Sequence, residues 1–126
     1  MFEQDYIMRQ LKEMIQAIFK ILFGIDVKSP LTELLESKED VELLERLFEM
    51  ADSGKINEAE KRLYDSMNGS INSLKTALLF YSYLNDKTDD FLKENSFDRE
   101  EIKAEVIVIM NKYNLNDLAS FFLSDQ

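Results

Sequence analysis

The sequence contains no cysteine, no histidine and no tryptophan, and the first two absences exclude several kinds of chemistry. Without thiolates or imidazoles, zinc, haem, iron–sulfur and blue-copper sites lose their usual ligands. Nucleophile systems of the Ser-His-Asp or Cys-His type lose an essential member for the same reason. We therefore expect no catalytic residues, no metal site and no cofactor, and a protein that is not an enzyme.

Glycine and proline are also scarce, with three and one residues respectively. An all-β protein needs many turn residues, whereas a helical protein needs few. Apolar residues make up 45% of the 126 residues, which is too many for a disordered chain and enough for a core without disulfides. The composition predicts one all-α domain spanning residues 1–126.

The sequence has no apolar run approaching the roughly 20 residues that span a bilayer. Its start, Met1 to Asp5, lacks the basic segment of a signal peptide, and the absence of cysteine fits a reducing compartment. The net charge of −10, from 25 acidic and 15 basic residues, repels phosphate backbones. We therefore expect a cytoplasmic protein that binds neither nucleic acid nor membranes.

Apolar periodicity and capping residues divide the chain into helices that form a single bundle of five to seven helices. The pattern predicts longer helices over residues 5–23, 38–52, 58–68, 71–85 and 99–113, short turns at 30–36 and 91–93, and a last short helix through Phe122. The predicted N-caps are Ser37, Asn57, Ser70, Ser96 or Asp98, and Asn116. The 71–85 helix is apolar on all sides, which predicts a central position in the bundle.

Two groups of polar residues are weak candidates for a ligand site. Asn85, Asp86, Asp89 and Asp90 carry oxygens suited to a hard cation, but they lack the glycine and the spacing of an EF-hand loop, so a solvated loop is expected. Four tyrosines on predicted helices are candidates for lining a small-ligand pocket, although tyrosine more often lies at the edge of a core. These four are Tyr64, Tyr81, Tyr83 and Tyr113.

The segment Val41–Met67 resembles one helical hairpin of the tetratricopeptide type. Large apolar residues of the first helix match at Leu43 and Met50, and the turn matches at Gly54-Lys55. The second helix matches at Glu58-Ala59, Leu63 and Ser66, whereas Leu47 stands where the motif prefers glycine. A solenoid needs about three repeats, so the resemblance implies a hairpin style of packing and no ligand groove.

The opening segment Asp5–Leu11, followed by Leu22-Phe23-Gly24, resembles the start of an uncharacterised family of small bacterial all-helical proteins. The resemblance is clear over the first helix and looser beyond it. It implies an all-helical fold and no assigned activity.

The first helix has an apolar arc of about 160°, wider than one packing seam requires. Three interpretations remain open: core covered by the 71–85 helix and the last helix, a homodimer interface, or a membrane surface with Arg9, Lys12 and Lys20 toward headgroups. The membrane is the weakest, because the helix is neutral overall. We predict a protein–protein interaction or self-association module, whose interface consists of Tyr6, Met8, Phe19 and Phe23 with Lys12 and Lys20 at its rim.

The rival hypothesis is a helical bundle that binds a small molecule, and an enzyme that uses a pair of carboxylates is a third option. The small-molecule site would use the helix that carries Tyr81 and Tyr83 together with the helix that carries Val106 to Met110.

Overall fold

A computed structural model of the chain describes residues 2–124, and this part of the chain contains eight helices and no strand. Five to seven helices were predicted; the number is larger because both predicted turns form helices, of four and six residues. In chain order the helices are α1 (Phe2–Phe23), α2 (Leu31–Leu34), α3 (Lys38–Asp52), α4 (Ile56–Ser66), α5 (Ile71–Asn85), α6 (Asp89–Glu94), α7 (Arg99–Lys112) and α8 (Asn116–Leu123).

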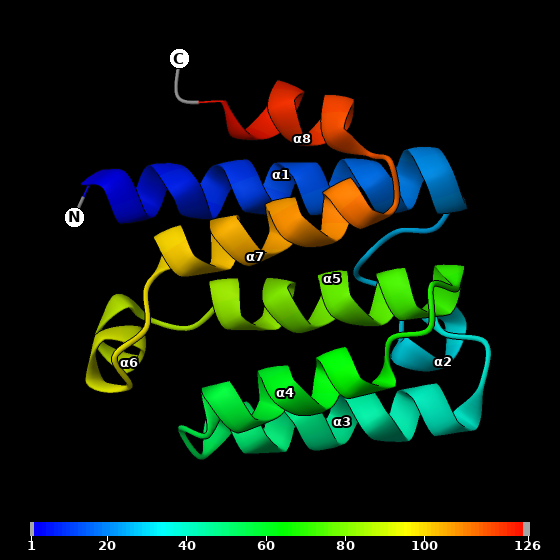
Figure 1. The fold of residues 1–126 in the computed structure, drawn as a ribbon, viewed down its shortest axis with the longest axis horizontal. Coiled ribbons are helices and arrows are strands. Elements are labelled where there is room, and N and C mark those ends of the chain that lie inside the picture. Colours follow the sequence, from blue (N-terminus) through cyan, green and yellow to red (C-terminus); the bar gives the residue numbers. More distant parts are fainter. Residues whose placement is uncertain (1, 125–126) are drawn as a thin grey trace.

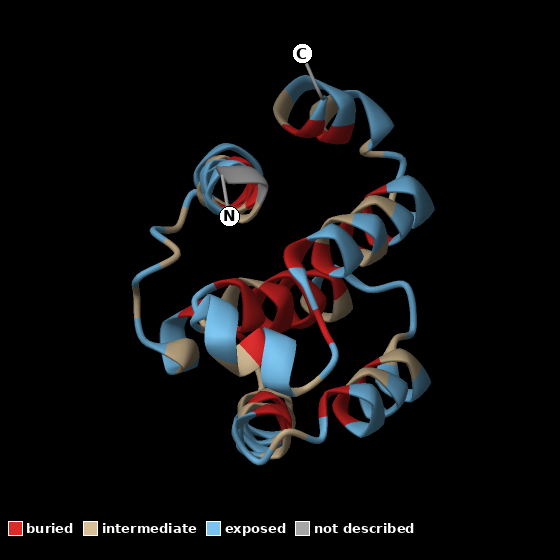
Figure 2. Ribbon diagram, turned by 90° about the vertical axis from the view of Figure 1, so that its left-hand side faces the viewer, coloured by how far each residue is buried: buried red, intermediate tan, exposed pale blue. Residues whose placement is uncertain are grey.

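The helices are arranged in layers around α5 (Figure 1). α3 and α4 lie on one side, α1 and α8 lie on the other, and α5 and α7 lie between them. α5 packs against α1, α3 and α7, and ten of its fifteen residues are buried. Figure 2, which looks along the main helices, shows buried residues concentrated in α5 and on the faces turned toward it. The central position predicted for this helix is therefore confirmed.

Side-chain caps begin several of the helices, as the sequence predicts. Ser37 Oγ accepts from Asp40 N at 3.0 Å, Ser70 Oγ from Ser73 N at 3.1 Å, and Asp98 Oδ1 from Glu101 N at 2.9 Å. Two predicted caps are wrong: α4 begins one residue before Asn57, and Asn116 is already the first residue of α8. The N-cap positions are instead taken by Lys55 and Leu115, and neither side chain makes a capping hydrogen bond.

α3 and α4 form an antiparallel hairpin (Figure 1) whose turn contains Gly54. Gly54 has φ of +83°, a conformation that a side chain at this position would disfavour. Leu47, Ala59 and Leu63 are fully buried in the hairpin. The large side chain of Leu47 is thus accommodated inside the hairpin.

Most of the wide apolar arc of α1 is covered by the chain's own helices. α5 and α8, the two predicted covers, both contact α1, and α7 contacts it as well. The buried apolar residues of α1 are Ile7, Leu11, Met14, Ile15, Ile18 and Phe19. Ile21 and Leu22, near the end of α1, are exposed by 70% and 45%, so burial within the chain accounts for most of the arc and not for all of it. No helix in the described range has the length and apolarity needed to cross a bilayer.

Candidate functional site

The structure divides the six predicted interface residues between the core and the surface. Phe19 is fully buried and makes an edge-to-face contact with Phe23, with ring centroids 5.2 Å apart. Met8 and Phe23 are half-buried, and Lys75 Nζ lies 4.9 Å from the Phe23 ring centroid. A partner cannot reach Phe19 in the folded chain, so this residue belongs to the core.

The other three predicted residues are accessible on α1. Tyr6 is 42% exposed, and both Lys12 and Lys20 are exposed. The lysines lie two helical turns apart, which places them on neighbouring parts of the same side of α1. Both lysines predicted for the rim are thus accessible, whereas Phe19 at the predicted centre is not.

A groove lies beside these lysines, between α1, the segment 27–34, α3 and α5; we call it the α1 groove. Its main hollow has a volume of about 270 Å³. The buried apolar residues Ile15, Leu34 and Leu79 line it, together with the half-buried Phe48. Lys12 and Lys28 also line it, so the hollow combines an apolar floor with two cationic side chains.

The α1 groove continues into a second hollow of about 220 Å³ farther along α1. The two hollows share Gln16, Val27 and Lys28, and the second adds Lys20 and Asp26. Asp26 Oδ1 accepts a hydrogen bond from the backbone nitrogen of Lys28 at 2.8 Å, which holds the turn at this end. The groove is thus elongated and runs beside both predicted rim lysines.

The aromatic wall of the groove is held in place by a polar cluster at its outer side. Phe48 and Tyr83 are stacked, with ring centroids 3.9 Å apart. The Tyr83 hydroxyl donates to Asp52 Oδ1 at 2.7 Å, and Lys87 pairs with the same carboxylate. The hydrogen bond from Lys87 lowers the pKa of Asp52, and Tyr83 contributes in the same direction. Together these contacts fix the orientation of the Tyr83 ring against α3.

The rival ligand site between α5 and α7 is occupied by core side chains. Tyr81, Val106, Ile109 and Met110 are fully buried, and the two helices pack directly against each other. The Tyr81 hydroxyl donates to Glu60 Oε2 at 2.6 Å, and the Tyr64 hydroxyl donates to Glu105 Oε1 at 2.8 Å. Burial and these carboxylates raise the pKa of both tyrosines, so both hydroxyls stay protonated donors at neutral pH.

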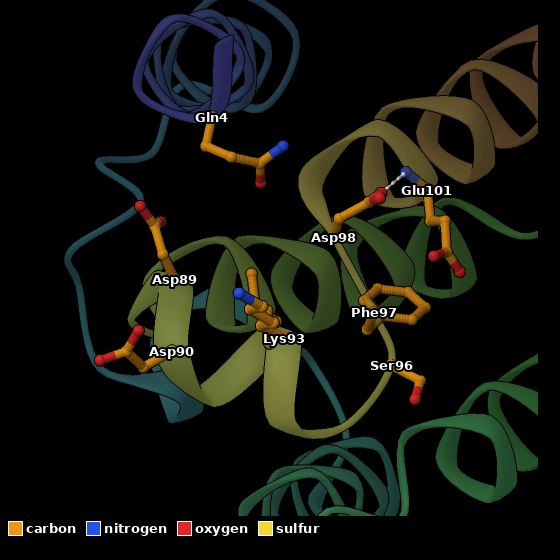
Figure 3. A pocket seen from close by; sticks show the side chains of 9 residues that line it. Gln4, Asp89, Asp90, Lys93, Ser96, Phe97, Asp98 and Glu101 are labelled. Atoms are coloured by element: carbon orange, nitrogen blue, oxygen red, sulfur yellow. Dashed lines mark hydrogen bonds between the residues drawn. The ribbon is translucent and has the colours of Figure 1, made fainter. Parts of the chain in front are cut away.

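A larger hollow of about 490 Å³ lies between Gln4, α6 and the start of α7 (Figure 3). Four of its nine lining residues are acidic, and two of these carboxylates already have partners: Asp89 pairs with Arg99, and Asp98 caps α7. Asp89 belongs to the predicted acidic loop. Across the residues that the structure describes, no cluster of three or more acidic side chains has a geometry that could hold a metal ion.

The sequence indicated Lys12 and Lys20 as interface residues, Tyr83 as a residue of a ligand pocket and Asp86 as part of an acidic loop, but it did not indicate the rest of the α1 groove. Lys28 and Val27 lie in a connecting segment without periodicity, and Ser82 lies on a helix whose apolar residues cover every side. Only the tertiary packing brings these residues beside α1. One sequence signal could have pointed to Lys28. It lies in the connection directly after the helix that carries Lys12 and Lys20.

Comparison of the chain with protein families gives one match, the family of unknown function DUF6483, over residues 1–114. This match covers most of the chain. The chain belongs to the DUF6483 family. The match confirms the resemblance of the opening segment to an uncharacterised family. Comparisons with curated proteins and with solved structures found no match.

The matched part of this DUF6483 chain includes every residue of the α1 groove, whereas α8 lies outside it. The family description carries no activity, so function has to be argued from the groove itself.

Proposed function

We propose that this DUF6483 protein is a non-catalytic protein–protein interaction module that binds its partner, a second protein or a second copy of itself, at the α1 groove. The observation that carries the proposal is a cationic edge on a strongly acidic chain. Lys12, Lys20 and Lys28 line one groove, while the chain as a whole has a net charge of −10.

These three lysines are available to a partner. The ion pairs of the described residues include Lys87–Asp52 and Arg99–Asp89, and none involves Lys12, Lys20 or Lys28. All three are exposed, so a partner would gain charge contacts without breaking contacts within the chain. Buried apolar pockets surrounded by polar rims are typical of the central contacts in protein interfaces.

The shape of the groove favours a protein partner over a small molecule. Its two hollows, of about 270 and 220 Å³, lie open along α1, whereas a small-molecule pocket usually encloses most of its ligand. A hollow of this size suits one or two anchoring side chains of a larger partner.

Two further parts of the proposal concern the scaffold and the compartment. The α3–α4 hairpin is of the tetratricopeptide type, which the glycine turn at Gly54 and the buried Ala59 support. It supplies Phe48 to the groove and otherwise acts as a support. The absence of cysteine supports the cytoplasm as the place of action.

The proposal is tested with a charge-reversal pair and a matched control. Lys12→Glu/Lys20→Glu reverses two lysines beside the groove, and Lys38→Glu/Lys61→Glu makes the same change in charge at exposed positions on α3 and α4. Each tagged protein is used for affinity capture from lysate of the source cells, and sedimentation measures self-association of the untagged proteins.

We expect wild type and the Lys38/Lys61 control to retain the same partner or the same oligomer, and the Lys12/Lys20 variant to lose it. Circular dichroism checks that all three proteins are folded. Equal retention by all three, or a monomer without any specific partner in every case, would contradict the proposal.

A further inference from the structure

We infer that the α1 groove recognises an acidic peptide segment of a partner protein, with carboxylates on the lysines and an apolar anchoring side chain in the hollow. The inference rests on the proposed function and names the chemistry of the partner. Three observations support it: the local charge, the apolar floor and the elongated shape.

The local charge of the groove is opposite to that of the molecule. Its lining contains three lysines, Lys12, Lys20 and Lys28, against two aspartates, Asp26 and Asp86. Asp26 is already engaged with the backbone of Lys28. The rest of the chain is strongly acidic, so an acidic segment is attracted here and repelled elsewhere. Electrostatic complementarity of this kind selects both the partner and its position.

The floor of the main hollow requires an apolar group. Ile15 and Leu34 are each 1% exposed and Leu79 is 6% exposed, so they form a firm surface that belongs to the core. The half-buried Phe48 closes one side, and its stacking on Tyr83 limits its movement. A leucine or phenylalanine side chain from a partner would displace water from this surface, and this apolar contact would anchor the segment.

The shape of the groove favours a peptide over a compact ligand. Two hollows of about 270 and 220 Å³ share Gln16, Val27 and Lys28, so an occupant of both extends along α1. Lys12 and Lys20 are eight residues apart on α1, which corresponds to about 12 Å along the helix axis. A peptide can place carboxylates at both positions with an anchor between them, whereas a short aliphatic acid has a single carboxylate.

The experiment measures fluorescence anisotropy of labelled synthetic peptides of about twelve residues with the full chain. The first peptide contains aspartate and glutamate around two leucines. In the second, alanine replaces both leucines, and in the third, lysine replaces every acidic residue. Sodium octanoate is the competitor that represents a small aliphatic acid.

We expect the acidic leucine peptide to bind and the other two to bind at least about tenfold more weakly. Binding should weaken as salt rises, because screening removes the attraction of the lysines. If the net charge of the whole chain dominated instead, salt would strengthen the binding of an acidic peptide.

Two pairs of variants locate the site. Lys12→Glu/Lys28→Glu should weaken binding by about tenfold or more, whereas Lys38→Glu/Lys61→Glu, with the same net charge, should have a much smaller effect. Gln16→Trp fills the part shared by both hollows, and Asn111→Trp makes a comparable change at an exposed position on α7. Gln16→Trp should abolish binding and Asn111→Trp should leave it unchanged.

Several outcomes would overturn the inference. These are binding of the basic peptide instead, equal loss in both charge-reversal variants, undiminished binding by Gln16→Trp, or octanoate binding without peptide binding. A partner captured through Lys12 and Lys20 in the absence of peptide binding would leave the proposed function standing and refute only the acidic segment. If neither partner capture nor peptide binding is observed, both the proposed function and the acidic segment are refuted.

Discussion

At the scale of single residues, the polar side chains in and around the core connect helices. Arg99, 2% exposed, donates to the backbone carbonyl of Asn85 at 3.1 Å, and its own backbone nitrogen donates to Gln4 Oε1 at 3.1 Å. Tyr81 similarly connects α5 to Glu60 of α4. Buried polar groups are costly when unpaired, so each of these contacts favours one arrangement of the helices.

Glu60 provides a prediction about pH. Burial raises its pKa above the ordinary value of 4.5, and Glu105 and Glu101 add to this effect while the Tyr81 hydrogen bond opposes it. A raised pKa in the folded state gives stability that is present below 4.5 and is lost as pH rises through the folded-state pKa. The Glu60→Gln side chain does not ionise, so it removes this loss of stability with rising pH. Its amide oxygen still accepts the hydrogen bond from Tyr81.

We therefore expect the Glu60→Gln variant to gain stability relative to wild type as pH rises from 4.5 toward neutrality. The gain should be on the order of 0.5 kcal/mol, because the carboxyl is only partly buried and solvent screens it. Urea unfolding at several pH values measures it. Glu58→Gln makes the same change in net charge at an exposed position on the same helix. A difference between Glu60→Gln and wild type that stays constant with pH would refute the shift.

Many single-residue features could be predicted from the sequence, and the exceptions have a common cause. The Ser37, Ser70 and Asp98 caps were predictable because a capping bond joins residues close in sequence. The Tyr81–Glu60 and Tyr64–Glu105 bonds were not, because their partners are 21 and 41 residues apart. Asn57 is not the N-cap because α4 begins one residue earlier, at Ile56. Ile56 is 2% exposed, and its burial favours a helix that includes it.

At the scale of helices and turns, two glycines follow the ends of helices but differ in the space around them. Gly24 follows α1 with φ of +67°, and, apart from the glycine and its two chain neighbours, no atom lies within 4 Å of the position that a Cβ would occupy. Gly54 follows α3 with φ of +83°, and a Cβ there would overlap Asn95 Oδ1 at the end of α6. The sequence predicts both glycines as helix ends. It could not predict that the α3–α4 turn packs against α6.

This difference predicts unequal effects of the same substitution. Gly24→Ala should cost about 1 kcal/mol, the usual penalty for a side chain in the left-handed conformation. Gly54→Ala should cost more, by about a further 1 kcal/mol, because the Asn95 side chain must move and its hydrogen bond to the Phe91 carbonyl is disturbed. Chemical denaturation of both variants measures the two costs.

Asn95→Ala supplies the control for this comparison. In a chain that already carries Asn95→Ala, the Gly54→Ala substitution should cost no more than Gly24→Ala, because the overlapping atom is gone. If Gly54→Ala remains the costlier substitution there, the extra cost arises from the turn itself and the packing explanation fails.

At the scale of the whole molecule, the layered arrangement depends partly on contacts that the sequence pattern does not assign. One interpretation of the α1 arc named α5 and α8 as its covers, and both contact α1, whereas the contact of α1 with α7 was not predicted. The α1 groove has the same origin. Its lysines on α1 were predicted as a rim, whereas most of its floor comes from α2 and α5 and one side from α3. Periodicity gives the buried face of a helix and leaves its neighbours undetermined.

The net charge of −10 leads to a prediction for the whole molecule. Like charges repel across a folded surface more than in the expanded unfolded chain, so an acidic protein is destabilised at low ionic strength. The Debye length falls from about 30 Å at 0.01 M salt to about 3 Å at 1 M. We therefore expect the thermal midpoint to rise by about 3 °C or more as sodium chloride is raised over this range.

The charge-reversal variants make this prediction quantitative, because Lys12→Glu/Lys20→Glu and Lys38→Glu/Lys61→Glu each change the net charge from −10 to −14. If repulsion over the whole surface sets the salt dependence, both variants should show the same steeper rise of the midpoint. If the cationic edge of the α1 groove also contributes local attraction to Asp26 and Asp86, the Lys12/Lys20 variant should be the less stable of the two at low salt. A midpoint that falls with salt in wild type would mean that attractive pairs outweigh the repulsion. The acidic surface would then act as a stabilising network, and the lysines of the groove would be its partners, no longer free for an acidic segment of another protein.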